Sequence, residues 1–129
     1  MPQAGAAPIP GRERESPVAT IMFRSGSAGL TANDRALLRH VAMLAQQNGA
    51  GLRVVGHAGE NAAGLDELSL RLFNFDMSWA RASAAAEELE RAGLPVQRIV
   101  IEAKGEMEPM RTAAAPDDPG NRRVVVYFQ

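Results

Sequence analysis

Short apolar segments rich in β-branched residues alternate along this chain with longer segments of helical periodicity. This alternation limits the possible folds more than any other feature of the sequence. The strand-like segments cover residues 18–23, 52–57, 98–103 and 122–128, and the helical segments cover 31–48 and 77–93. Strands that alternate with helices of this length imply βαβ crossovers, so the sequence predicts a two-layer α/β sandwich. The spacing leaves the order of the strands in the sheet open.

The first helical segment carries signals at both of its ends. Thr31 is a suitable N-cap, and Asp34 stands at the third helical position, where a carboxylate favours the positive end of a helix. The pair Asn48–Gly49 predicts the end of the helix. The apolar residues expected on its inner face are Leu37, Leu38, Val41, Leu44 and Ala45.

The second helical segment is expected to begin with Ser78 as its N-cap and to end at Gly93. Its inner face is predicted to consist of Ala82, Ala85, Ala86 and Leu89. This start would place Arg81 in the first turn, where a cation costs about 0.3–1 kcal/mol. The same position suits anion binding, because backbone N–H groups and the guanidinium would converge on a carboxylate or phosphate. The alternative is a surface arginine paired with Asp76 or Glu60.

Composition excludes several classes of function. The chain has 129 residues, is 46% hydrophobic, carries a formal net charge of −1 and contains no cysteine. One domain over 18–129 is expected, preceded by a flexible linker over 1–17 that is rich in proline and glycine. The near-neutral charge argues against nucleic acid or an anionic membrane as the main partner. No apolar run in 1–17 resembles a signal peptide or a membrane span, so no membrane insertion is expected.

Residues that could support catalysis or metal binding are sparse. His57 ends a predicted strand and has Glu60 nearby, but no nucleophile and no third metal ligand accompany them. The stretch "RSGSAGLT" at 24–31 lacks both the lysine of a Walker sequence and the GxGxxG order, so it is interpreted as a connecting loop. The sequence therefore predicts no catalytic residue, no metal and no cofactor. A small enzyme that uses His57 with Glu60 is the weakest alternative.

Several stretches together resemble the OmpA-like C-terminal domain, the peptidoglycan-binding module that is also found in the Pal lipoprotein and in MotB. The resemblance spans about residues 18–128. Phe23 and "LT" at 30–31 match the first strand and helix, "VVGHAG" stands for "xGHTD", and "NFDMSWARA" stands for "NxxLSxxRA". Further on, "AGLPVQRIVIEAKGEMEP" resembles "xGIxxxRIxxxGxGExxP", and "NRRVVVYF" resembles "NRRVEIxx".

This resemblance implies a βαβαββ fold that binds the diaminopimelate residue of the peptidoglycan stem peptide. In the family, the aspartate of "GHTD" meets the ligand's ammonium and the arginine of "LSxxRA" meets its carboxylate. The family's site positions carry over onto Asn74, Ser78, Arg81 and Arg122, with Ala58 at the threonine position and Gly59 at the aspartate position. The stretch 60–73, between the second strand and the second helix, is an insertion that could form a helical turn or two. Glu60 is the first candidate to supply the missing carboxylate, followed by Asp66, Glu67 and Asp76.

Two functions follow from this resemblance. The first is a non-catalytic periplasmic domain that binds peptidoglycan and anchors a larger outer-membrane or envelope protein to the cell wall. The second is a degenerate OmpA-like domain that acts without peptidoglycan binding as a scaffold, through an envelope protein partner or as a homodimer. The missing aspartate and the insertion favour the second.

Overall fold

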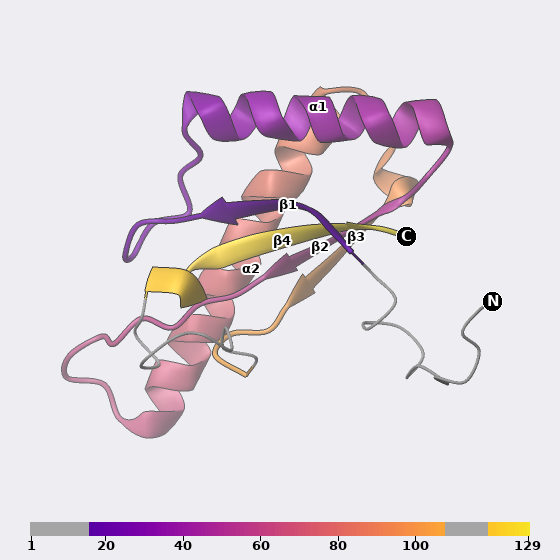
Figure 1. The fold of residues 1–129 in the computed structure, drawn as a ribbon. Helices are drawn as coiled ribbons and strands as arrows, with labels where there is room; N and C mark the ends of the chain where they lie inside the picture. Colours follow the sequence, from indigo (N-terminus) through magenta and orange to yellow (C-terminus); the bar gives the residue numbers. More distant parts are fainter. Residues whose placement is uncertain (1–15, 108–118) are drawn as a thin grey trace, which may run out of the picture.

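The elements follow one another in the order β1 α1 β2 α2 β3 β4 in the computed structural model, which describes residues 16–107 and 119–129 (Figure 1). The bounds are β1 Pro17–Met22, α1 Ala32–Asn48, β2 Leu52–Gly56, α2 Glu67–Arg91, β3 Ile99–Ala103 and β4 Arg123–Phe128. Single 3₁₀ turns at Val96–Arg98 and Pro119–Asn121 precede β3 and β4. The predicted α/β class and βαβαββ order are confirmed. The predicted linker at 1–17 lies almost wholly outside the described residues.

The four strands form one sheet in the order β1-β4-β2-β3. β2 pairs with β3 in parallel, as the crossover through α2 requires, and β4 lies antiparallel between β1 and β2. The carboxyl ends of β1, β2 and β3 therefore meet the start of β4 at one end of the sheet. The loops that leave this end are the ones that can build a common site.

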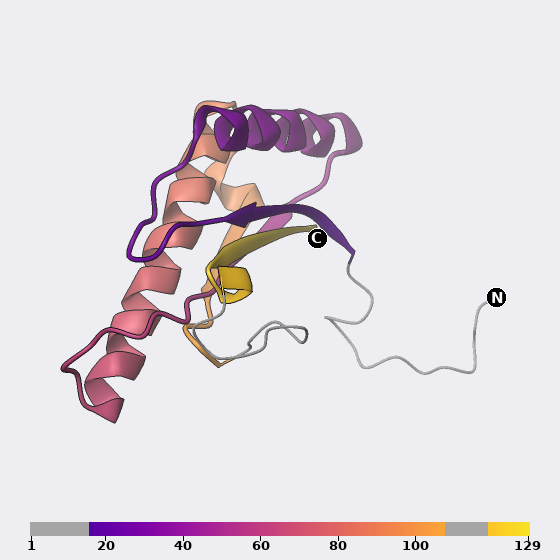
Figure 2. The same cartoon turned by 60° about the vertical axis from the view of Figure 1, so that its left-hand side comes forward.

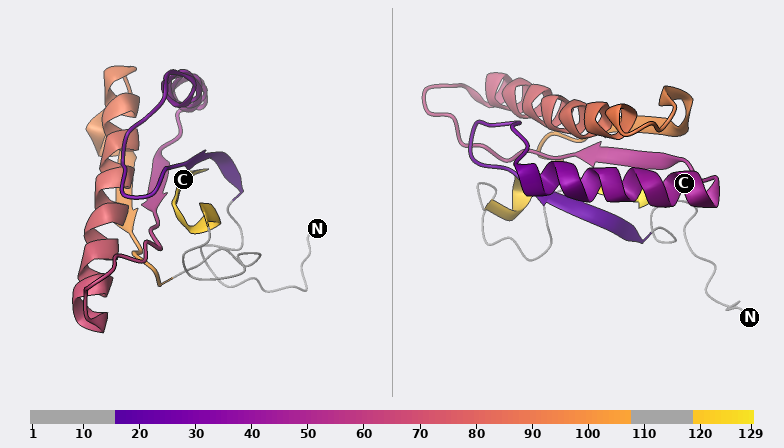
Figure 3. Two further views of the ribbon diagram at one scale, coloured as in Figure 1. Left: turned by 90° about the vertical axis from the view of Figure 1, so that its left-hand side faces the viewer. Right: turned by 90° about the horizontal axis from the view of Figure 1, so that it is seen from above.

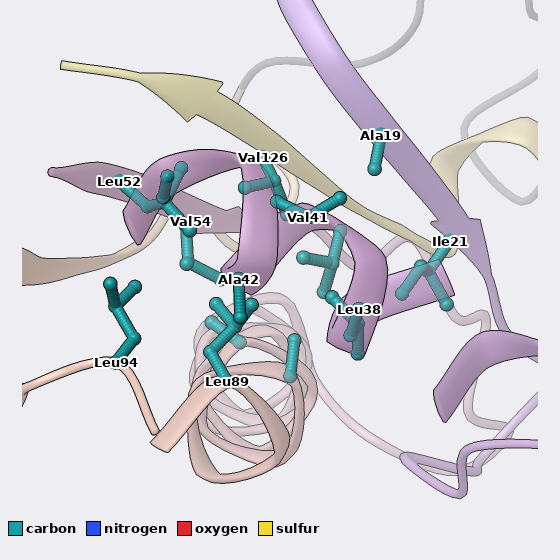
Figure 4. Packing of buried hydrophobic residues seen from close by; sticks show 14 of the residues in the cluster. Ala19, Ile21, Leu38, Val41, Ala42, Leu52, Val54, Leu89, Leu94 and Val126 are labelled. Atoms are coloured by element: carbon teal, nitrogen blue, oxygen red, sulfur yellow. The ribbon is translucent and has the colours of Figure 1, made fainter. Parts of the chain in front are cut away.

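Both helices lie on the same face of the sheet (Figure 3), and the core fills the space between the two layers (Figure 4). Residues from every layer contribute to it, including Ile21, Val41, Val54, Leu89 and Val126. The predicted inner face of α2 is confirmed, since its three alanines and its leucine are all buried. The inner face of α1 differs from the predicted set at its edge. Leu37 is 37% exposed, whereas Ala42, which was not in the predicted set, is buried.

The ends of α1 follow the predicted capping chemistry. Thr31 Oγ1 accepts a hydrogen bond from the Asp34 amide at 3.0 Å, and Asp34 Oδ2 accepts one from the Thr31 amide at 2.9 Å. This reciprocal capping box satisfies two backbone donors that a helix start leaves unpaired. The helix stops at Gly49, whose φ of 66° lies in the left-handed region that favours glycine.

The N-cap of α2 lies twelve residues before the predicted N-cap, Ser78. The N-cap is Asp66, whose side chain accepts from the Ser69 amide at 2.7 Å. The insertion at 60–73 is therefore only partly a loop, because residues 67–73 form the first turns of the helix. With 25 residues, α2 is about 37 Å long, whereas the five residues of β2 span about 16 Å. The amino-terminal part of α2 consequently projects past the sheet (Figures 1 and 2).

Candidate functional site

Arg81 is the centre of a buried polar cluster at the end of the sheet where β1 and β2 leave it. Its side chain is fully buried, and all five of its N–H groups have acceptors. Nε donates to the carbonyl of Ser27 at 2.8 Å, Nη1 donates to the carbonyl of His57 at 3.2 Å, and Nη2 donates to the carbonyl of Arg24 at 3.1 Å. The two remaining N–H groups donate to the two carboxylate oxygens of Glu60.

Glu60 is the anionic partner of this guanidinium and is itself buried. Its Oε1 lies 3.3 Å from Arg81 Nη1, its Oε2 accepts from Arg81 Nη2, and Oε2 also accepts from the Gly26 amide at 3.1 Å. Burial raises the pKa of Glu60. The hydrogen bonds from Arg81 and Gly26 and the charge of Arg81 lower it more, so this pKa lies below its ordinary value of 4.5. Glu60 is therefore held as a carboxylate.

Asn74 fixes the backbone of Glu60. Its Oδ1 accepts from the Glu60 amide at 2.9 Å, and its Nδ2 donates to the Glu60 carbonyl at 3.2 Å and to Glu106 Oε1 at 2.8 Å. The Glu60 side chain can leave Arg81 only by rotating about its own bonds, because its backbone is clamped by this paired contact.

Ser78 holds α2 against the sheet. Its hydroxyl donates to the Phe75 carbonyl at 2.7 Å and accepts from the Gly105 amide at 2.9 Å. The approach is close at Gly56, where a Cβ would lie 2.0 Å from the Ser78 carbonyl oxygen. Only glycine fits there, so the "GH" of the β2 end and the serine of α2 belong to one packing contact.

The predicted position of Arg81 in the first turn of a helix is wrong. Because α2 begins at Glu67, Arg81 lies about four turns further along, beyond the reach of the helix-terminal charge. Ser78 is likewise no N-cap, since its hydroxyl bonds the carbonyl three residues earlier in the same helix. The side chain is held by loop carbonyls and Glu60, and the predicted link to unpaired helix amides does not exist.

Arg81 does not face an open cleft, because the guanidinium is 0% exposed and Glu60 is 7% exposed. The alternative interpretation, a surface arginine paired with Asp76 or Glu60, included the correct partner, Glu60. It was wrong about the surface location, because Arg81 is buried. The stretch 24–27, interpreted from sequence as a plain connection, supplies two of the carbonyls that hold Arg81. Its small residues allow the backbone to approach the guanidinium, and this was the signal in the sequence.

The remaining predicted site residues surround this cluster. Ala58 and Gly59 are buried, and the Ala58 amide donates to the Gly105 carbonyl at 2.9 Å. Arg122 is half-buried and donates from Nε to the Phe23 carbonyl at 3.1 Å. The ring of Phe23 lies 5.4 Å from the Arg81 guanidinium carbon, measured to the ring centroid. The structure thus brings Glu60, Asn74, Ser78 and Arg81 together, with Arg122 near the rim.

Within 16–107 and 119–129, no three histidine, aspartate or glutamate side chains are grouped as a metal site would require. No helix in these residues is long and apolar enough to cross a membrane.

The sequence of the domain matches the model of the OmpA family over residues 22–123. The chain belongs to the OmpA family. This OmpA-family domain is 34% identical over 88 residues to Outer membrane protein 40 of Porphyromonas gingivalis, an alignment that covers 68% of this chain and 22% of that protein. The chain thus spans about a fifth of the length of this relative.

Three solved structures of low sequence identity share the fold of this OmpA-family domain. The OmpA-like domain of FopA1 from Francisella tularensis has a TM-score of 0.73 and 21% identity, and the match covers 85% of this chain and 72% of that one. The peptidoglycan-associated lipoprotein of Burkholderia pseudomallei has a TM-score of 0.72 and 18% identity, with 85% of this chain and 89% of that one covered. The C-terminal domain of Helicobacter pylori MotB has a TM-score of 0.71 and 14% identity, with 87% of this chain and 86% of that one covered. The predicted family is confirmed.

Proposed function

We propose that this OmpA-family domain is a non-catalytic periplasmic module that binds the diaminopimelate of the peptidoglycan stem peptide and so anchors a larger envelope protein. Family membership supports this location and role, since one relative is named as an outer membrane protein and another as a peptidoglycan-associated lipoprotein. Asn74, Ser78 and Arg81 occupy the positions of the family motif and lie in one cluster.

The observation that carries the proposal is the contact between Glu60 and Arg81. A ligand carboxylate would use the same two N–H groups, on Nη1 and Nη2, that the Glu60 oxygens occupy. Bidentate capture of a carboxylate is the chemistry for which a guanidinium is best suited. Glu60 therefore occupies the place that a ligand carboxylate would take, and binding requires the Glu60 side chain to rotate away from Arg81.

This exchange favours a ligand that carries both charges. If a ligand that carries only a carboxylate displaced Glu60, the carboxylate of Glu60 would lose its cationic partner. A carboxylate without a partner in a buried site costs free energy. The free end of diaminopimelate presents an ammonium and a carboxylate on one carbon. Its carboxylate re-pairs Arg81 and its ammonium pairs the displaced Glu60, so the exchange conserves charge. Glu60 then performs the task of the family's aspartate from one position further along the chain than Gly59.

The hydroxyl of Ser78, the only hydroxyl among the predicted site residues, supports a non-catalytic role. It is committed as donor to the Phe75 carbonyl and as acceptor to the Gly105 amide. In this arrangement it acts as a structural contact between α2 and the β3 turn. No sequence feature supplies a base positioned to activate it.

The test is an NMR titration with a diaminopimelate-containing muropeptide, with pimelate as the control that lacks ammonium groups. Binding at the cluster is expected to shift the amide signals of Gly26 and Glu60 with the muropeptide and not with pimelate. Arg81→Lys keeps the positive charge but cannot donate two parallel hydrogen bonds to a carboxylate, so this variant is expected to bind the muropeptide at least tenfold more weakly. Arg71→Lys, an exposed change in the same helix, is the matched control. Equal binding of muropeptide by Arg81→Lys, with folding verified by thermal unfolding, would refute the site.

The second candidate function is an envelope scaffold that does not bind peptidoglycan. The observation that favours it is the saturation of Arg81, which has no donor left for a ligand. If the scaffold is correct, neither muropeptide nor sacculi will perturb the folded parent domain at millimolar ligand, and co-sedimentation with sacculi will be absent. That outcome would overturn the proposal of wall binding.

A further inference from the structure

The amino-terminal half of α2 exposes a row of large apolar side chains, which are not covered by the described parts of the chain. Within the helix they are Leu68 at 65% exposure, Leu72 at 56%, Phe75 at 47% and Trp79 at 48%. Leu65, just before the N-cap, is 43% exposed. The four helical residues are called the seam below. Of the other large apolar side chains of α2, Leu89 packs into the core, and Leu70, Phe73 and Met77 are half-buried. The seam is therefore the exposed apolar stripe of this helix.

The spacing of the seam is that of a coiled coil. The four members of the seam are separated by four, three and four residues, and Leu65, which precedes the helix, lies three residues before the first of them. This 3-4 alternation places them at the a and d positions of two heptads and so on one stripe along the helix. The same spacing continues through Ala82, Ala86 and Leu89, which are buried in the core, so the seam is the part of this stripe that lies beyond the covered half of the helix. Arg81 and Ala85 lie on a neighbouring side of the helix. A stripe of this kind is complementary to another of the same kind, because knobs from one helix enter holes in the other.

The charges beside the seam indicate the orientation of such a pair. Arg71 precedes Leu72 at a g position, and Asp76 follows Phe75 at an e position. In a parallel pair of helices, a g residue faces the e residue five positions later on the partner helix. Arg71 therefore faces Asp76 of a second copy, and the twofold axis generates the reciprocal contact. Among the residues that the structure describes, Arg71 pairs with Glu67 at 2.8 Å, where both side chains are more than half exposed.

We propose that the seam is the interface of a parallel homodimer, in which two α2 helices pair along their amino-terminal halves. This part of α2 projects past the sheet, so a second copy can approach it without meeting the strands (Figures 1 and 2). The carboxylates of Asp66, Glu67 and Asp76 border the seam and disfavour an anionic membrane surface as the alternative occupant. A partner with the same seam satisfies the apolar stripe and the flanking charges together.

The interface is small. Two copies of the seam with its flanking residues bury about 1,000 Å² in total, at the lower limit for specific interfaces. A pre-formed helix loses little entropy on pairing, which partly compensates for the small area. The dimer is therefore expected to dissociate in the micromolar range and to strengthen when the domain is held at high local concentration.

The experiment is sedimentation equilibrium on the full chain from low micromolar to millimolar concentration. It is combined with the fluorescence of Trp79, the single tryptophan of the chain. Reversible dimerisation with a concentration-dependent blue shift is expected. Leu72→Glu is expected to weaken dimerisation by at least tenfold. Met43→Glu, at a 44% exposed position on α1, is the matched control and is expected to dimerise as the parent does.

Charge exchange tests the orientation. Arg71→Asp and Asp76→Arg each place like charges opposite one another across the seam and are expected to weaken the dimer, while the double exchange is expected to restore it. A monomer throughout the concentration range, or a dimer unaffected by Leu72→Glu, would overturn the proposal. A blue shift that requires anionic vesicles would overturn it in favour of a membrane surface. None of these changes touches the Arg81 cluster, so muropeptide binding and dimerisation can fail independently.

Discussion

Glu60→Gln is the substitution that most directly tests whether the buried pair with Arg81 supports the fold. Glutamine keeps the size of the side chain and one acceptor oxygen. The new side-chain NH₂ group takes the place of one carboxylate oxygen. In one orientation it faces the N–H of Arg81 Nη1, and in the other it faces the N–H groups of Arg81 Nη2 and Gly26. In both orientations a donor faces a donor. The guanidinium remains buried with its charge uncompensated. Removing one member of a buried ion pair costs about 3–5 kcal/mol.

The expected result is therefore a loss of about 3–5 kcal/mol in the free energy of unfolding at pH 7. For a domain of this size each kcal/mol lowers Tm by about 4 °C, so Tm falls by about 12–20 °C. Urea unfolding followed by circular dichroism measures the first quantity, and a thermal scan measures the second. Glu67→Gln removes an exposed pair with Arg71 and is the matched control, with an expected loss of about 0.5 kcal/mol or less.

The acid dependence of stability provides a second measurement on the same pair. The pKa of Glu60 in the folded domain lies below 4.5, so the unfolded chain takes up this proton first as the pH falls. The stabilising contribution of the carboxylate is fully present above that value and is lost as the pH falls through the folded pKa. The difference in the free energy of unfolding between the parent and Glu60→Gln is thus expected to decrease as the pH falls through the folded pKa of Glu60. A difference in the free energy of unfolding below about 1 kcal/mol at pH 7 would refute the claim that this ion pair stabilises the fold. A difference that stays constant in acid would refute it as well.

Substitutions elsewhere test single features of the fold. Gly56→Ala is expected to cost more than about 3 kcal/mol or to prevent folding, because its Cβ would lie 2.0 Å from the Ser78 carbonyl oxygen; circular dichroism and urea unfolding detect either result. Gly49→Ala meets no atom within 4 Å and is expected to cost only about 1–2 kcal/mol, from its left-handed φ alone, in the same assay. Thr31→Ala removes the cap on the Asp34 amide and is expected to cost about 1 kcal/mol of unfolding free energy.

The parts of the fold that depend on local pattern were predictable. Strand positions followed from apolar β-branched runs, and the start of α1 followed from Thr31 and Asp34. The start of α2 was mispredicted because Ser78 resembles an N-cap in isolation. The available signal was the absence of any glycine or proline from 65 to 92, together with Asp66 as a cap and the Glu67–Arg71 pair one turn apart.

The state of Arg81 was not predictable from local pattern. Its acceptors come from two separate loops that lie 21 to 57 residues away along the chain. Only the assembled sheet brings these carbonyls to one point, so the small residues of 24–27 indicate a close backbone approach without identifying Arg81 as its partner. The identity of its partner was accessible, because Glu60 was the first carboxylate after the Gly59 position. Its burial was not accessible, since it depends on how closely the 24–27 loop covers the guanidinium.

The register of β1 against β4 determines how the domain responds to mechanical load. Pro17 pairs with Tyr127 at one end of this ladder, and Met22 pairs with Arg123 at the other, next to the Arg81 cluster. A pulling force between a tether at Pro17 and a molecule held at the cluster runs along β1, perpendicular to its hydrogen bonds. These bonds are loaded in shear and must break together. A force that separated Pro17 from Phe128 would instead peel them apart one at a time, so β1 resists a force directed from Pro17 toward the Arg81 cluster better than a force directed from Pro17 away from Phe128.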